Sequence, residues 1–235
     1  MEKAQVLAHL TRAVAYEERI RTRSLPHRLC AAGVSLLGGD GGALTLAYTE
    51  PQRLTLCATT DEAARLEDLQ EVLGEGPGAD ASRRGSMASA FVSAGRSAVW
   101  PVFVEAAFAA VGDVSVHAFP MSSGTTVIGV FTVYQLPPRL LAESSDIACF
   151  VANSIGAAIL SDPASDTPEG LGSWASRALV HQATGMVMAQ LGVNSDDAVA
   201  LLRAHAFADN VSLTEMARSV NELTFDFSRD DGARR

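Results

Sequence analysis

Few side chains in this sequence have the types and spacing that catalysis or metal binding requires. The three cysteines, Cys30, Cys57 and Cys149, are far apart and form no C-x-x-C pair, and the five histidines complete no zinc-ligand spacing with them. The sequence contains no paired catalytic acids and no nucleophile motif. We therefore predict that the protein is not an enzyme, binds no metal and needs no cofactor. The cysteines are expected to be small buried thiols in a reducing cytoplasm.

One apolar set with a histidine could form a ligand pocket, because such pockets are lined mainly by hydrophobic and aromatic side chains. The candidate ligand-binding residues are Trp100, Phe103, His117, Phe119 and Met121. The alternative is that the four apolar residues are ordinary core and that His117 is a hydrogen-bonded structural histidine. The Gly-rich run at residues 74–78 is interpreted as a simple turn, since it fits neither a phosphate-binding loop nor a dinucleotide fingerprint.

Composition limits the classes to which the protein can belong. Hydrophobic residues make up 48% of the 235 residues and charged residues 19%, which is enough apolar material for sizeable buried cores. The formal net charge of −9 argues against a general binder of nucleic acids or anionic membranes. The N-terminus lacks the apolar core of a signal peptide, and no apolar stretch approaches the roughly 18–20 residues of a membrane span. We expect a cytoplasmic protein without membrane contact.

A change of composition at residues 161–172 divides the chain. This segment has two prolines, three acidic residues and no apolar periodicity, which is typical of a linker. Before it, apolar spacing predicts an N-terminal helix over residues 1–23 and a domain over residues 24–160. The elements expected in that domain are helices at 29–37, 61–73, 99–111 and 140–160, and strand pairs at 43–49 with 53–59 and at 114–121 with 126–134. Their order predicts an α+β domain with an antiparallel sheet and packed helices.

Residues 173–227 have the pattern of an all-α three-helix bundle, followed by a tail at 228–235 that is expected to be disordered. Helices are predicted at about 174–191, at about 196–208 and from Ser212 onward. Ser195 is the expected N-cap of the second helix, Ser212 and Glu215 form a capping box for the third, and Gly192 closes the first. Three helices of this size give a thin core, so a partner surface is expected.

The segment 24–160 resembles a GAF domain of the type found in actinobacterial GAF–ANTAR regulators. The resemblance rests on LGEGPGADA (73–81), the Trp100-Pro101 step, SVHAFPM (115–121) and IGVFTVY (128–134). It implies a GAF-like module that senses a small molecule or interacts with a protein, without identifying the ligand. Many relatives carry a cysteine where Gly78 stands, so a reactive thiol at that point is not expected here. A haem bound through a histidine is a conceivable alternative.

Residues 173–227 resemble an ANTAR domain, an RNA-binding antiterminator module. The motifs are HQATGMVMAQLGV (181–193), DDAVALLRAHA (196–206) and SLTEMARSV (212–220). Members of this family act as dimers that recognise paired hairpin loops in a leader RNA, and the RNA structure competes with a terminator hairpin. The resemblance therefore implies a homodimer that binds leader hairpins.

Carried over position by position, the resemblance implies an RNA-binding set of Gln182, Thr184, Gly185, Arg203, Thr214 and Arg218. Many ANTAR domains have a lysine at the position of Thr184, so one phosphate contact is missing. Gly185 costs roughly 1 kcal/mol against alanine in mid-helix, which indicates a packing or contact reason. Arg203 can stack on a base or bind phosphate, or it can pair with an acid such as Asp196. Thr214 and Arg218 lie early in a helix whose N-terminus suits phosphate.

Two functions remain in competition. The first is a transcription antitermination regulator with a GAF-like sensor domain. The alternative is a regulator that acts through protein–protein interaction of the C-terminal bundle, without direct RNA binding. Between residues 174 and 223 the sequence has three arginines and five acidic residues, whereas most RNA binders have a basic patch. The RNA hypothesis thus depends on the resemblance rather than on charge.

Overall fold

The computed structural model describes residues 2–18, 24–47, 53–94, 99–161 and 171–230. The chain divides into an N-terminal unit that carries the sheet and a C-terminal helical unit whose first described helix begins at Leu171. The five strands are β1 (Gly41–Ala47), β2 (Arg53–Ala58), β3 (Ala88–Val92), β4 (Val114–Ser123) and β5 (Thr126–Gln135). They form one antiparallel sheet in the order β2-β1-β5-β4-β3. The predicted α+β class is confirmed.

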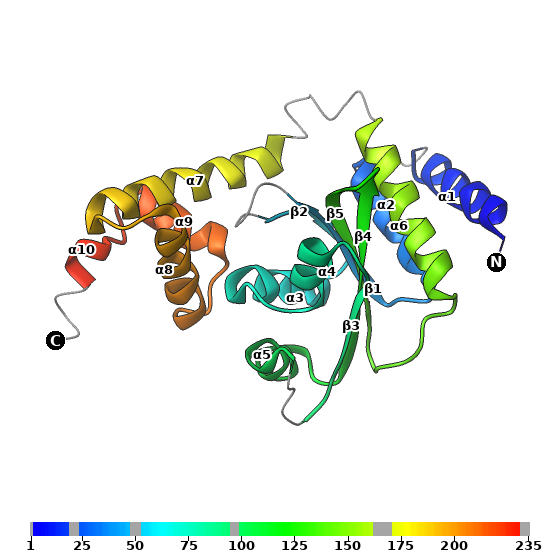
Figure 1. The fold of residues 1–235 in the computed structure, drawn as a ribbon, viewed down its shortest axis with the longest axis horizontal. Helices are drawn as coiled ribbons and strands as arrows, with labels where there is room; N and C mark the ends of the chain where they lie inside the picture. The colour runs from blue at the N-terminus through cyan, green and yellow to red at the C-terminus, as the bar shows by residue number, and fades with distance from the viewer. Residues whose placement is uncertain (1, 19–23, 48–52, 95–98, 162–170, 231–235) are drawn as a thin grey trace. The chain divides into compact units, whose positions relative to one another are not determined.

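Helices cover both faces of this sheet (Figure 1). On one side lie α2 (Leu25–Leu37) and α6 (Ser145–Leu160), with α1 (Lys3–Glu18) packed against them. On the other side lie α3 (Asp61–Leu73), α4 (Pro77–Arg84) and α5 (Pro101–Val111). We call these two sides the α2–α6 face and the α3–α5 face.

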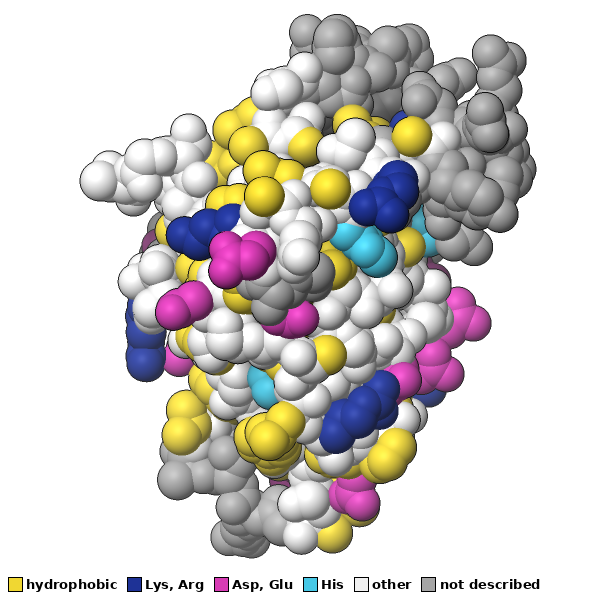
Figure 2. All heavy atoms as spheres, turned by 90° about the vertical axis from the view of Figure 1, so that its right-hand side faces the viewer, with side chains coloured by type: hydrophobic (Ala, Val, Ile, Leu, Met, Phe, Trp, Pro, Cys, Tyr) yellow, Lys and Arg dark blue, Asp and Glu magenta, His cyan; other side chains and the backbone are white. Residues whose placement is uncertain are grey.

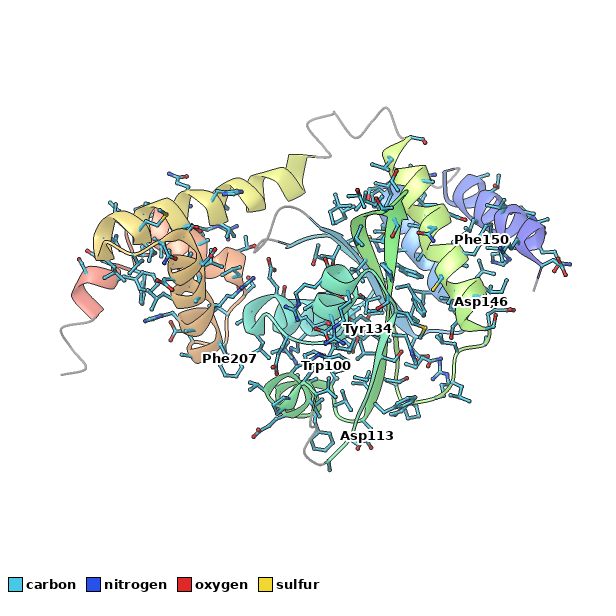
Figure 3. The ribbon with its side chains drawn as sticks, in the orientation of Figure 1. Trp100, Asp113, Tyr134, Asp146, Phe150 and Phe207 are labelled. Atoms are coloured by element: carbon cyan, nitrogen blue, oxygen red, sulfur yellow. The ribbon has the colours of Figure 1, made fainter. Side chains whose placement is uncertain are left out.

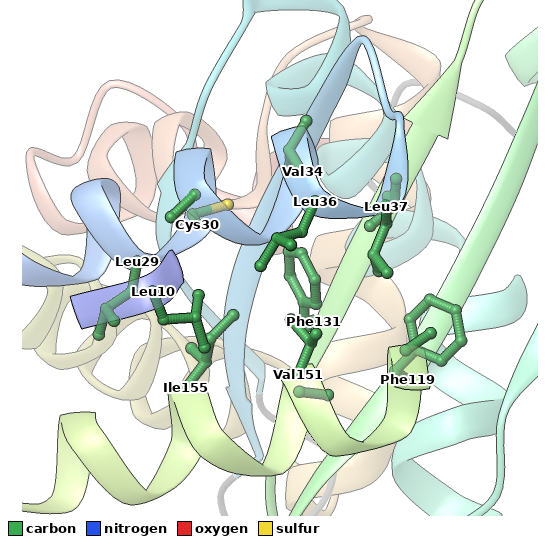
Figure 4. Packing of buried hydrophobic residues seen from close by; sticks show 14 of the residues in the cluster. Leu10, Leu29, Cys30, Val34, Leu36, Leu37, Phe119, Phe131, Val151 and Ile155 are labelled. Atoms are coloured by element: carbon green, nitrogen blue, oxygen red, sulfur yellow. The ribbon is translucent and has the colours of Figure 1, made fainter. Parts of the chain in front are cut away.

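The main hydrophobic core fills the α2–α6 face (Figure 4). Phe119 and Phe131 of the sheet pack there against Val34 of α2 and Val151 and Ile155 of α6, and all five are at most 6% exposed. Burying side chains of this kind contributes about 1.5–3 kcal/mol each. This layer fixes the sheet against its two long helices.

Close packing also explains why glycines open β1. The sequence pattern predicts that the glycines at 38–42 interrupt regular structure, yet Gly41 and Gly42 are strand residues. A Cβ atom on Gly42 would lie 2.4 Å from Cγ2 of Val34, so only glycine lets helix α2 approach the strand this closely. Gly38, in the left-handed conformation (φ +71°), ends α2 as predicted, whereas Gly41 and Gly42 belong to β1 because the strand passes close to α2.

Most predicted elements of the N-terminal unit are confirmed, with corrected ends. The cap of α3 is Thr60, whose hydroxyl accepts from the backbone N–H of Ala63, and Asp61 is the first helical residue. Helix α6 begins at Ser145 after its cap Ser144, whereas the sequence predicts a start at Leu140. Helix α4 and strand β3 were not predicted, because each is too short to show a clear period. Residues 19–23 and 48–52 of the predicted helix and hairpin lie outside the described residues.

The C-terminal unit is a three-helix bundle with a short added helix. Its helices are α7 (Leu171–Leu191), α8 (Ser195–Ala208), α9 (Leu213–Asn221) and α10 (Phe227–Asp230). The three predicted helices and their apolar stripes are confirmed, and the core consists of Val180, Ala183, Val187, Ala198, Leu202, Ala206, Leu213, Met216, Ala217, Val220 and Phe227.

Two expectations for this unit need correction. The N-cap of α8 is Asn194, whose side chain accepts from the backbone N–H of Asp197, and Ser195 is already the first helical residue. The tail expected to be disordered from residue 228 begins inside α10, where Phe227 is 3% exposed. The capping box of Ser212 and Glu215 and the left-handed Gly192 (φ +69°) are confirmed. Residues 162–170 and 231–235 lie outside the described part of the chain.

Candidate functional sites

Helix α7 divides the predicted RNA-binding residues between its two faces. Gln182 and Gly185 are exposed, whereas Thr184 is 6% exposed and belongs to the buried side with Ala183 and Val187. The Thr184 hydroxyl donates to the backbone carbonyl of Val180, with 2.7 Å between the two oxygens. The Thr184 side chain is therefore packed and hydrogen-bonded inside the bundle, which does not fit its predicted role as a surface contact.

Gly185 has no packing reason within its own bundle. A Cβ atom at this position would meet no heavy atom within 4 Å. The neighbouring small residue Ala183 is fully buried, so the compact-packing explanation holds for Ala183 and fails for Gly185. A glycine in a helix interior lowers helix stability by about 0.8–1.0 kcal/mol relative to alanine. The bare backbone at Gly185 thus has a stability cost and no compensation among the described residues of the bundle.

Helix α9 presents a polar stripe next to α7. Thr214, Arg218 and Asn221 recur at positions i, i+4 and i+7, which places them on one helix face. The Asn221 side-chain amide donates to the backbone carbonyl of Leu179 in α7 at 2.9 Å. This contact places the C-terminal end of the stripe against α7, one helical turn from Gln182. Arg218 is exposed and Thr214 is half-buried within this stripe.

Arg203 occupies a different helix from these residues. It lies on α8, is half-buried, and comes one turn after the buried Val199. The first turn of α8 carries the exposed acids Asp196 and Asp197, which suit the positive end of the helix dipole. The carboxylate of Asp197 accepts from the side-chain amide of Asn194 at 2.8 Å. The start of α8 is therefore an acidic surface, and it weakens any phosphate site there.

Two phenylalanines that the sequence analysis did not single out, Phe225 and Phe227, pack against His205 of α8. The His205 ring lies 5.3 Å from the ring of Phe225 and 4.6 Å from that of Phe227, measured between centroids. The backbone N–H of Phe227 also donates to the side chain of Gln190 in α7 at 3.2 Å. Edge-to-face pairs of this kind contribute about 0.5–1.5 kcal/mol beyond burial. The two phenylalanines follow no helical period, so no periodic signal marked them.

The five predicted ligand-binding residues do not line one site. Phe119 and Met121 belong to the core of the α2–α6 face. Trp100 immediately precedes α5 (Figure 3), and Phe103 lies in the first turns of that helix, on the other side of the sheet. Neighbouring residues of β4 point to opposite faces of the sheet. Phe119 therefore points to the α2–α6 face, whereas Ala118 packs on the other face against Ala81 of α4. The expectation of a single pocket from these residues is therefore wrong.

His117 has a structural environment at the edge of the sheet. Its Nδ1 lies 2.9 Å from the hydroxyl of Ser89 on β3, and its ring meets that of Phe91 edge to face. Burial lowers the pKa of His117 from its ordinary value of 6.5. These contacts agree with the alternative that His117 is a hydrogen-bonded structural histidine.

The α3–α5 face holds a buried polar network that the sequence did not reveal. The carboxyl group of Glu67 in α3 accepts from the hydroxyl of Tyr134 at 2.5 Å and from that of Thr45 at 3.1 Å. The Gln70 side-chain amide contacts both Glu67 and Tyr134, and its oxygen accepts from the backbone N–H of Gly78 at 2.6 Å. All three network side chains from α3 and β5 are at most 2% exposed. The network ties α3, the sheet and the start of α4 together.

Two neighbours complete this region. Thr132, on the same face of β5 as Tyr134, is fully buried, and its hydroxyl has no hydrogen-bond partner among the described residues. The carboxyl of Glu75 accepts from the backbone N–H of Phe103 at 2.6 Å and so links the Gly-rich run to α5. The run at 74–78 is thus the junction of three helices rather than a simple turn.

Residues 173–220 match the profile of the ANTAR domain family. This segment is an ANTAR domain. The match covers all three helices of the bundle and every position of the predicted RNA-binding set. No curated protein matches the chain in sequence.

Several solved structures align with part of this chain at low sequence identity. A domain assigned to a two-component sensor histidine kinase from Sinorhizobium meliloti aligns at 16% identity with a TM-score of 0.46, covering 61% of this chain and 96% of the other. The GAF domain of a phosphoenolpyruvate-protein phosphotransferase from Coxiella burnetii aligns at 13% identity and TM-score 0.46, covering 68% and 95%. The corresponding Acinetobacter GAF domain aligns at 16% identity and TM-score 0.42, covering 66% and 95%.

The face of the molecule that Figure 2 shows carries charged side chains of both signs. Basic and acidic side chains are interspersed there among the residues drawn in colour, and they gather into no basic patch. Within the described ranges, no group of three metal-ligating side chains occurs, and no helix is both long and apolar enough to cross a bilayer. In the ANTAR segment itself, residues 174–223 include three arginines and five acidic residues, so its charge favours no extended contact with phosphates.

Proposed function

We propose that this protein regulates transcription by antitermination. Its ANTAR domain binds paired hairpin loops in a leader RNA, and the sheet-bearing unit acts as a GAF-like sensor of a small molecule or of the dimer state. The observation that carries the proposal is the ANTAR match at residues 173–220, together with the exposed Gln182 and Gly185 beside the Arg218 stripe. The protein would act in the cytoplasm as a homodimer, without catalysis.

The geometry narrows the RNA-binding set. Gln182 and Gly185 on α7 and Thr214 and Arg218 on α9 form the proposed surface, which we call the α7–α9 surface. Gln182 can hydrogen-bond a base edge, Arg218 can bind phosphate or stack on an unpaired base, and Gly185 leaves the helix backbone open to close approach. Arg203, half-buried on α8, is proposed as a supporting residue at its margin. Thr184 is assigned a structural role.

Dimerisation offsets the low positive charge of a single ANTAR domain. RNA hairpin loops expose bases that can be recognised by stacking and hydrogen bonding, so fewer phosphate contacts are needed than on a duplex. When two domains engage two loops of one RNA, the second contact becomes intramolecular and the avidity rises. We therefore expect weak binding to one hairpin and much stronger binding to a pair.

Sensing would act through the segment between the two units. Helix α6 packs on β4 and ends at Leu160, and α7 of the ANTAR domain begins at Leu171. A ligand can change the relation of two ANTAR domains in a dimer only if it binds two arrangements with different affinity. The α3–α5 face, with the unpaired hydroxyl of Thr132, is the proposed place for such a ligand.

The test is RNA binding by the full-length protein. A two-hairpin leader RNA and a loop-scrambled control are titrated at two salt concentrations. We expect loop-dependent binding that Arg218→Ala weakens about tenfold, equivalent to about 1.4 kcal/mol. Arg65→Ala is the matched control, because Arg65 is an exposed arginine of α3 outside the ANTAR domain, and it should leave the affinity unchanged.

The other outcomes separate the hypotheses. Loop-dependent binding that Arg218→Ala leaves intact but Arg203→Ala weakens would move the interface from α9 to α8. A folded protein without loop preference at either salt concentration would contradict RNA binding. That result would favour the alternative, in which the C-terminal bundle binds another protein.

A further inference from the structure

Two of the three cysteines lie on elements that face each other. Cys30 is in α2 and is fully buried in the main core, while Cys57 is in β2 and is half-buried. Cys57 packs against the same hydrophobic cluster that contains Cys30. The third cysteine, Cys149, is half-buried on α6.

A β-bulge in β2 decides which face Cys57 occupies. Thr45 pairs with Thr55 and Leu44 pairs with Cys57, so Leu56 is an extra residue in the ladder. The hydroxyls of Thr45 and Thr55 lie 3.4 Å apart, and Thr45 donates to Glu67 on the α3–α5 face. Simple alternation would place Cys57 on that same face.

The extra residue reverses this orientation. Cys57 pairs with Leu44, which belongs to the core of the α2–α6 face, and directly paired residues of an antiparallel ladder point to the same side. Bulges commonly redirect a side chain in this way. Cys57 therefore points toward α2, where Cys30 is buried.

The neighbourhood of Cys57 also affects the titration of Cys30. The hydrogen bond with Cys57, followed by burial, raises the pKa of Cys30 well above its ordinary value of 9.0. Cys30 is thus a protonated, enclosed thiol at neutral pH. Cys57, the more accessible of the two, is the sulfur that a small oxidant in solution can reach first.

We propose that Cys30 and Cys57 are a peroxide-oxidisable pair that closes a reversible disulfide between α2 and β2. A peroxide oxidises Cys57 to the sulfenic acid, which breaks the O–O bond and releases water when the oxidant is hydrogen peroxide. The Cys30 sulfur, losing its proton, then attacks the Cys57 sulfur, and the sulfenic oxygen leaves as a second water. Two thiols lose two electrons, and one peroxide accepts them. Closing the bridge requires the two sulfurs to reach a bond length of about 2.05 Å.

This site is independent of the proposed RNA function. The bridge would fasten edge strand β2 to α2 on the sensor unit, while both residues lie outside the ANTAR domain. Loss of RNA binding would not affect the proposal, and failure to form the bridge would not affect the antitermination hypothesis.

The experiment treats the full-length protein with hydrogen peroxide and then maps its thiols and disulfides by mass spectrometry without reduction. We expect two of the three cysteines to be consumed, with Cys149 remaining a free thiol and a Cys30–Cys57 linked peptide that dithiothreitol reverses. Bridge formation should be faster at pH 9 than at pH 7, because the Cys30 thiolate fraction rises with pH.

Variants separate the pair from general thiol oxidation. Cys57→Ser should abolish the linked peptide, and Cys149→Ser, which removes a half-buried thiol outside the pair, should leave its yield unchanged. Stepwise oxidation of Cys57 to the sulfinic acid in the wild type, or a bridge to Cys149, would overturn the proposal. Circular dichroism before and after treatment checks that oxidation acts on folded protein.

Discussion

The two units differ in how far apart in sequence the hydrogen-bond partners of their polar side chains lie. In the sheet-bearing unit the partners are far apart in sequence: Glu67 and Tyr134 are separated by 67 positions, and Gln135 and Gly38 by 97. In the ANTAR domain most of them are neighbours: Asn194 and Asp197 lie three residues apart, and so do Ser212 and Glu215. Most hydrogen-bond partners of polar side chains are therefore distant in sequence in the first unit, and most are close in sequence in the second.

This difference has an energetic consequence. A local cap satisfies a helix end at the protein surface, where water can replace a lost partner. A buried network has no such replacement, so the loss of one member leaves its partners without hydrogen bonds. Equal changes in chemistry should therefore have unequal effects in the two units.

The largest effect is expected for Glu67→Ala in the sheet-bearing unit. This change leaves the hydroxyls of Tyr134 and Thr45 and the amide of Gln70 without their shared acceptor. Each buried unsatisfied group costs about 1–3 kcal/mol, and partial rearrangement reduces the sum, so we expect a loss of roughly 2–4 kcal/mol. Hydrogen exchange measured by mass spectrometry should show faster exchange in β1 and β5, with the ANTAR helices unchanged.

The control for this change is Glu105→Ala, which removes an exposed carboxylate of α5. Surface changes of this kind usually stay within about 0.5 kcal/mol. If Glu67→Ala and Glu105→Ala have the same small effect, the network does not hold the unit together, and the comparison between the units fails.

A smaller effect is expected for Ser212→Ala in the ANTAR domain. The Ser212 hydroxyl accepts from the backbone N–H of Glu215 at 3.2 Å, and the Glu215 carboxylate accepts from the backbone N–H of Ser212 at 2.9 Å. Loss of an N-cap side chain costs about 0.5–2 kcal/mol, typically about 1. Ser195→Ala is the matched control, since Asn194 and not Ser195 caps α8. Equal losses in both variants, measured by urea unfolding, would contradict the assigned caps.

This cap also predicts a pH dependence. Hydrogen bonds from the backbone and the hydroxyl of Ser212 lower the pKa of Glu215 below its ordinary value of 4.5. A lowered carboxylate pKa means that its stabilising contribution is present above pH 4.5 and is lost as the pH falls through the folded-state pKa. The difference between wild type and Ser212→Ala should shrink over that range in urea unfolding repeated at several pH values.

The same contrast explains what the sequence could predict. The ANTAR helices, the Ser212 capping box and both strand hairpins were predicted correctly, because their signals lie within a few residues of one another. Strand β3 could not be found in this way, since five residues show too little alternation. The reversal of Cys57 at the bulge depends on the pairing of two strands, which no local pattern records.

The candidate sites follow the same rule. Thr184 was placed on a surface by family position, yet its hydroxyl bonds the preceding helical turn and its side chain is buried. Phe119 and Met121 were grouped with Trp100 because all are apolar, but which face of a sheet a residue occupies depends on register and on the helices that cover it. Glu67, Gln70 and Tyr134 come from separate elements, so their meeting was invisible before the fold was known.

The smallest expected effect is the change in stability when a helical glycine is replaced by alanine, and this change should have opposite signs in the two units. Gly185→Ala should stabilise the ANTAR domain by about 0.8–1.0 kcal/mol, because a methyl group there meets nothing within 4 Å and alanine is the better helix former. Gly33→Ala is the matched change in α2, where the new Cβ would lie 2.8 Å from Phe131, and it should destabilise the sheet-bearing unit. Urea unfolding of both variants gives the change in the free energy of unfolding, which should be positive for Gly185→Ala and negative for Gly33→Ala.

The Gly185 variant also sharpens the proposed interface, because stability and binding should separate in it. If RNA approaches the bare backbone of α7 at Gly185, the more stable Gly185→Ala protein should bind the two-hairpin RNA more weakly than wild type. If the Gly185→Ala variant is more stable and binds RNA as well as wild type, Gly185 does not belong to the α7–α9 surface. RNA binding would then not explain why a glycine is exposed at this position. Weaker binding by a stabilised domain cannot be attributed to unfolding, so that outcome would locate the contact on α7 itself.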